Sequence, residues 1–129
     1  MPRLRFVDAL RDRAWLDAVA GVVRTFTGPA RRGLRDAPAG GWEERLVAAW
    51  ARRHPERLRP PPAERPHRAA VAAAVLGEAL AEAHPGSAER ALLERALDAL
   101  LAERHRIRGL DPEAARLLAG SRRELRRAA

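Results

Sequence analysis

Prolines and glycines divide this chain of 129 residues into segments of helical length, and this division restricts its possible folds more than any other feature. Between the breaks, apolar side chains recur every three to four residues, which is the period of an α-helix. No segment shows the alternation of apolar and polar residues that is typical of a half-buried strand. The spacing predicts an all-α protein, a single bundle-like domain of five helices.

The N-terminal helices are predicted to occupy about residues 6–53, as segments 6–26 and 42–53. Thr27-Gly28-Pro29 is expected to end the first, and residues 27–41 to form a loop with a short turn near residues 30–34. His54-Pro55 is expected to end the second, since a residue before proline is disfavoured in the α region. The apolar face of the first segment changes sides near residues 11–13. Either the helix breaks there, or its N-terminal arm packs on something other than the body of the domain.

A proline-rich linker over residues 54–66 is predicted to separate these helices from a C-terminal three-helix segment over about 66–127. Its three consecutive prolines, residues 60–62, favour extended polyproline structure. The three helices are expected from Pro66 to about Ala83, from Ala88 to Arg108, and from Asp111 onward. Ser87 is suited to cap the second of them, because a serine hydroxyl accepts a hydrogen bond from a backbone N–H of the first turn.

Several residue types are missing, and each absence excludes a class of chemistry. The chain has no cysteine, which excludes zinc–cysteine sites, iron–sulfur clusters, cysteine nucleophiles and disulfides. It also has no lysine or tyrosine, and no serine lies in a Gly-x-Ser-x-Gly turn. We therefore expect a non-enzymatic protein with no catalytic residues and no cofactor. No targeting signal or membrane-spanning run is evident, which favours a cytoplasmic protein without a membrane span.

The chain is strongly basic, with 25 arginines against 17 acidic residues, a formal net charge of +8 and a pI near 11.6. The use of arginine in place of lysine carries no information here, because the whole composition is skewed as in a GC-rich genome. The net charge is informative, since codon bias does not force an excess of cations. It predicts affinity for polyanions or acidic partners.

The fifth predicted helix has an apolar face and an arginine-rich face. With the arginines that precede residue 109, this gives eight cations in the last 26 residues. Such a stripe is suited to the phosphate backbone of DNA or RNA, without base readout. The alternative is an ordinary solvated face. The predicted nucleic-acid-binding residues are Arg104, Arg106, Arg108, Arg116, Arg122, Arg123, Arg126 and Arg127.

A second hypothesis is a protein–protein assembly or regulatory subunit, a homo- or hetero-oligomer. The helix predicted from Ala88 has a heptad line of apolar residues, which is typical of helices that pack against a partner. The predicted interface residues are Leu93, Leu97, Leu100 and Ile107.

A third hypothesis, a small helical enzyme or metal site, depends on Glu78 and Glu82. These glutamates are one helical turn apart, and like charges at that spacing repel unless a cation answers them. A metal ion or substrate cation would do so, but an arginine from a neighbouring helix is the more economical answer. The four histidines show no zinc-ligand spacing, so no metal site is expected.

Overall fold

The computed structural model describes the backbone of residues 2–103 and the side chains of residues 12–103. Four α-helices follow one another in this part of the chain: α1 (Pro2–Ala30), α2 (Trp42–Arg53), α3 (Arg68–Glu82) and α4 (Ala88–Ala102). Two short 3-10 helices, η1 (Pro55–Leu58) and η2 (Pro62–Glu64), lie between α2 and α3. No strand occurs in residues 2–103, which confirms the all-helical prediction. The count there is four rather than five, and the predicted fifth helix lies outside these residues.

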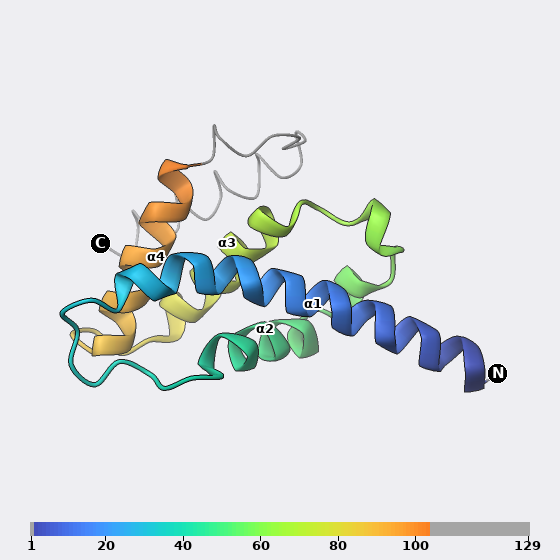
Figure 1. The fold of residues 1–129 in the computed structure, drawn as a ribbon, viewed down its shortest axis with the longest axis horizontal. Helices are drawn as coiled ribbons and strands as arrows, with labels where there is room; N and C mark the ends of the chain where they lie inside the picture. Colours follow the sequence, from blue (N-terminus) through green and yellow to red (C-terminus); the bar gives the residue numbers. More distant parts are fainter. Residues whose placement is uncertain (1, 104–129) are drawn as a thin grey trace.

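The first helix is longer than predicted at both ends. It is continuous across residues 11–13, so the change of apolar face does not break it. Its first turns extend past all the other helices (Figure 1). At the other end it continues through Gly28 and Pro29 to Ala30, because proline removes only its own donor. The last turn is still closed by the Arg31 N–H, which donates to the Thr27 carbonyl at 3.1 Å.

The four helices share one core, to which every helix contributes. α1 packs against α2, α3 and α4, and α3 lies against both α2 and α4 (Figure 1). The buried side chains of this core include Val19, Trp50, Leu76 and Leu97, one from each helix. α3 is buried on most of its surface, and its many alanines allow its neighbours to approach closely.

The linker over residues 54–66 does not form one extended stretch, although extended polyproline was predicted for its three consecutive prolines. Two 3-10 turns replace it, each with a proline at its first position, where the fixed φ of proline suits a helical start. Of the three consecutive prolines, Pro61 has polyproline angles (φ −55°, ψ 150°). α3 begins at Arg68 rather than Pro66, because the His67 side chain caps it by accepting from the Ala69 N–H at 3.1 Å.

The start of α4 agrees with the sequence prediction. The Ser87 hydroxyl accepts from the Arg90 N–H at 3.1 Å, as an N-cap serine should. The helix ends at Ala102 with Glu103 as its C-cap, earlier than the predicted end at Arg108, and residues 104–108 lie outside the described part of the chain. Among residues 2–103, no helix is long and apolar enough to cross a membrane.

Candidate functional site

The predicted nucleic-acid-binding arginines all lie beyond the part of the chain that the structure describes. This holds for Arg104, Arg106, Arg108, Arg116, Arg122, Arg123, Arg126 and Arg127, and also for Ile107 of the predicted interface. Their role therefore stays a prediction.

The three remaining residues of the predicted interface lie in the core of the chain itself. Leu93, Leu97 and Leu100 each have 0 % of their surface exposed. α4 packs against both α1 and α3 of the same chain. These helices therefore cover the three leucines that were predicted to contact a partner. The heptad line is explained by intramolecular packing, and in this fold the three leucines are not available to a second chain.

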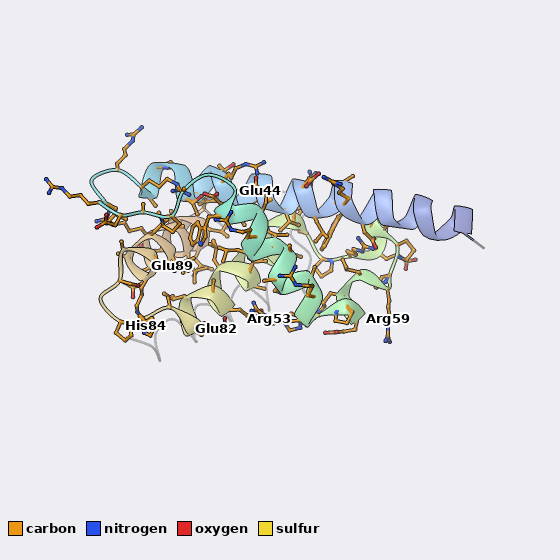
Figure 2. All side chains as sticks on the ribbon, turned by 90° about the horizontal axis from the view of Figure 1, so that it is seen from below. Glu44, Arg53, Arg59, Glu82, His84 and Glu89 are labelled. Carbon is orange, nitrogen blue, oxygen red and sulfur yellow. The ribbon has the colours of Figure 1, made fainter. Side chains whose placement is uncertain are left out.

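Glu78 and Glu82 form ion pairs with an arginine of a neighbouring helix. Arg53, in the last turn of α2, places Nη2 at 3.2 Å from Glu78 and Nη1 at 3.5 Å from Glu82. Figure 2 shows Arg53 and Glu82 on the same side of the molecule. Glu78 also lies 2.6 Å from Nε2 of His54. Among the described residues, no group of three or more His, Asp or Glu side chains could hold a metal ion. These glutamates therefore belong to an ion-pair network between α2 and α3.

The described histidines occupy helix ends and do not gather at one site. His54 follows α2, where its ring lies 5.5 Å from that of Trp50 and its Nδ1 lies 3.3 Å from Glu56. His67 caps α3, and His84 is exposed in the turn before α4. His105 lies outside the described residues. Each of the three described positions is explained by local structure.

A buried polar cluster that sequence analysis missed fastens the loop between α1 and α2. Glu43 is only 4 % exposed, and its Oε1 accepts from the Thr27 hydroxyl at 2.8 Å and from Arg31 Nη2 at 2.5 Å. Burial raises the pKa of Glu43, but the hydrogen bonds from Arg31, its own backbone and Thr27 outweigh this, leaving the pKa below its ordinary value. Arg31 also donates to the Pro38 carbonyl. The glutamate thus stays ionised and holds the loop closed.

A second missed feature is Arg65, whose side chain is 2 % exposed. Its Nη2 lies 2.6 Å from Asp12 Oδ1, and its guanidinium carbon lies 4.8 Å from the centre of the Trp15 ring. It also donates to two linker carbonyls, from Nη2 to Leu58 at 2.7 Å and from Nε to Pro60 at 2.8 Å. Arg65 therefore clamps the proline-rich linker onto α1.

Several exposed arginines take no part in such contacts. On or beside the linker these are Arg52, Arg57 and Arg59, which we call the linker arginines. No ion pair joins them to any described residue. Arg59 points away from the body of the molecule in Figure 2. Their guanidinium groups are thus available to an external anion.

A groove of about 470 Å³ lies between α1 and α2. Its floor includes the apolar side chains of Leu16, Ala20 and Val47, and carboxylates lie along its rim. Two of these, Asp12 and Glu44, are paired with Arg65 and Arg24 of the same chain. The third carboxylate, Asp17, is exposed, so two of the three carboxylates of the groove serve as structural ion-pair partners.

The comparisons with known proteins add no assignment. No family model, no curated protein and no solved structure matches this chain. The functional argument must therefore come from the residues themselves.

Proposed function

We propose that this is a non-enzymatic protein that binds nucleic acid through the phosphate backbone. The observation that carries the proposal is the distribution of charge. The last 26 residues hold eight of the 25 arginines and only three acidic residues. Guanidinium groups bind phosphate oxygens in a bidentate manner, and such contacts need no particular base sequence.

The ion pairs among the described residues bear on this proposal, because they engage several of the chain's own carboxylates. Asp12, Glu43, Glu44 and Glu78 are each paired with an arginine of the same chain. These carboxylates are thereby partly neutralised within the fold. Because each pair also takes up one arginine, a polyanion would be attracted by the remaining excess of arginine over acid, which is three in residues 1–103 and five in residues 104–129.

The test is the binding of the full chain to short duplex DNA and to single-stranded RNA, by fluorescence anisotropy, from about 50 to about 200 mM salt. We expect affinity to fall steeply with salt. The Arg123→Ala/Arg127→Ala variant should flatten the logarithmic slope by roughly one unit for each phosphate that these arginines neutralise. A matched variant, Arg13→Ala/Arg45→Ala, removes two exposed arginines of α1 and α2 and should leave the slope nearly unchanged.

The proposal would be overturned if the protein bound neither polymer at physiological salt. It would also be overturned if the two variants weakened binding equally, because the arginines would then act only through net charge.

A second candidate function, self-association, is favoured by the projecting start of α1. The first turns of this helix extend past the other helices (Figure 1). By helical spacing, Val7, Leu10 and Ala14 share a face nearly opposite to the one that α1 turns to the core. A second copy that covered this apolar stripe would stabilise the arm. Sedimentation velocity should then show a dimer that Val7→Glu/Leu10→Glu dissociates; a monomeric wild-type protein would eliminate this candidate.

A further inference from the structure

We propose that the linker arginines form a second phosphate-contact site, which the Arg65 clamp holds in place. This inference rests on the proposed function and names a part of the nucleic-acid interface outside residues 104–127. The residues are Arg52, at the end of α2, and Arg57 and Arg59, on and just after η1.

The first argument is the contrast between these arginines and their neighbours in the chain. Arg53 is next to Arg52, yet it pairs with Glu78 and Glu82. Arg65, at the far end of the linker, is buried against Asp12. The linker arginines are exposed and have no ion-pair partner among the described residues.

The acids near the linker arginines do not cancel this cluster. Glu56 is the acidic residue within the segment 52–59, and its Oε1 lies 3.3 Å from Nδ1 of His54. A hydrogen bond from its own backbone, the His54 contact and the charge of Arg57 lower the pKa of Glu56, so this glutamate offsets part of the local positive charge. Glu64 lies on the separate turn η2. With Arg53 paired elsewhere, the three linker arginines stand against one glutamate in this segment and leave a local surplus of positive charge.

The second argument is that the backbone under these arginines is fixed. The Arg57 N–H donates to the His54 carbonyl at 3.0 Å, which closes η1 onto the end of α2. The carbonyls of Leu58 and Pro60 both accept from the Arg65 side chain. These two carbonyls flank Arg59, so the backbone on either side of it is tied to α1. A preorganised contact loses less conformational entropy on binding than one on a flexible linker.

The third argument is the cost of the clamp itself. Burying a guanidinium removes it from water, and an apolar side chain often stabilises such a position equally well. An apolar side chain could not, however, bond to Leu58, Pro60 and Asp12 at once. Arg65 therefore specifies one conformation of the linker in addition to filling space. That conformation presents Arg59 to solvent, as Figure 2 shows.

The test uses the full-length chain and a short generic duplex DNA in the same salt series. The variant Arg57→Gln/Arg59→Gln should lower the logarithmic salt slope by about two units, because each neutralised phosphate contributes about 0.9 to that slope. The matched variant Arg13→Gln/Arg45→Gln makes the same change in net charge on α1 and α2 and should keep the wild-type slope.

The outcomes separate this inference from the proposed function. If wild-type protein binds and Arg123→Ala/Arg127→Ala flattens the slope, but the linker variant behaves as the matched control, the linker site is wrong and the proposed function stands. If wild-type protein binds neither duplex DNA nor the single-stranded RNA of the earlier test, both fail; if it binds the RNA alone, the same variants are compared on that RNA. Arg57 and Arg59 are exposed, so replacing them should leave the fold intact. Circular dichroism of each variant checks that a change in slope does not come from misfolding.

The positioning role of Arg65 has its own readout. Arg65→Lys keeps the charge but cannot make all of the clamp's hydrogen bonds. It should weaken DNA binding by several-fold at a temperature where the protein remains folded. Leu16 lies in the groove between α1 and α2 and packs against the core. Leu16→Ala therefore loosens this packing and serves as a stability control. Equal weakening of binding in the two variants would show that Arg65 acts only through stability.

Discussion

Among single residues, several arginines of the described chain bond to its own backbone carbonyls and hold loops or helix ends in place. Arg31 donates to the Pro38 carbonyl, Arg65 to the carbonyls of Leu58 and Pro60, and Arg95 to those of Ala30 and Arg32. Each joins a loop or helix end to another part of the fold. Arginine suits this role because its planar group carries five donors in a fixed arrangement. The described arginines therefore include some that bond to backbone carbonyls, some that pair with carboxylates, such as Arg53, and some that are exposed without an ion-pair partner, such as Arg59.

The Glu43 cluster gives a prediction about pH. Because the folded state lowers the pKa of Glu43, its stabilising effect is present above the pKa of the unfolded chain and is lost as the pH falls through the folded pKa. Glu43→Gln resembles the protonated side chain. It should destabilise the protein by about 1–3 kcal/mol near neutral pH, and by less as the pH falls below the ordinary glutamate pKa of 4.5.

Urea denaturation of both proteins across a pH series measures this difference. Glu89→Gln, on the first turn of α4, is a suitable control, since no ion pair or hydrogen bond of Glu89 occurs among the described residues. A difference between wild type and Glu43→Gln that is independent of pH would contradict the role assigned to this carboxylate.

At the scale of helices, the sequence correctly predicted some of the helix ends that neighbouring glycines and prolines determine. The predicted range of α2, 42–53, is the observed one, because glycines precede it and His54-Pro55 follows. The prediction that an arginine answers Glu78 and Glu82 is also confirmed. Which arginine does so could not be predicted, because Arg53 is distant in sequence and 25 arginines are available.

The linker shows why the remainder could not be predicted. Its conformation depends on Arg65, whose carboxylate partner, Asp12, is 53 residues away. Three prolines in a row favour an extended chain when considered alone, whereas here the clamp fixes the backbone between the two observed turns. The Glu43 cluster is similarly non-local, since Thr27 and Glu43 come from different helices. Tertiary contacts thus overrode local preference where buried polar groups had to be satisfied.

The core position of α4 gives a prediction that separates packing from partner binding. Leu97 has 0 % of its surface exposed, so Leu97→Ala should lower the free energy of unfolding by about 2–5 kcal/mol. Leu58→Ala, at a half-buried linker position, should cost less. Urea denaturation gives the stability and sedimentation velocity the mass. Unchanged stability with a lowered oligomeric mass would instead support the leucine line as an interface.

For the whole molecule, most of the net positive charge lies beyond the residues that form the described core. The buried side chains of the described residues run from Trp15 to Leu101 and come from all four helices. The residues from 104 onward carry three acids and eight arginines, and so contribute most of the net charge of +8. On the proposed function, we therefore expect residues 15–101 to determine folding and residues 104–127 to supply most of the affinity for a polyanion.

A chain that ends at Glu103 tests this separation. We expect it to unfold cooperatively in urea, because residues 15–101 supply a complete set of mutually packed helices. Its affinity for duplex DNA should fall sharply, and the salt slope should drop to the roughly two to three units that the linker arginines provide. A shortened chain that binds DNA as the full chain does would place the interface wholly on the helical core. A shortened chain that no longer folds would show that residues beyond 103 complete the core, and would overturn the separation of folding from binding.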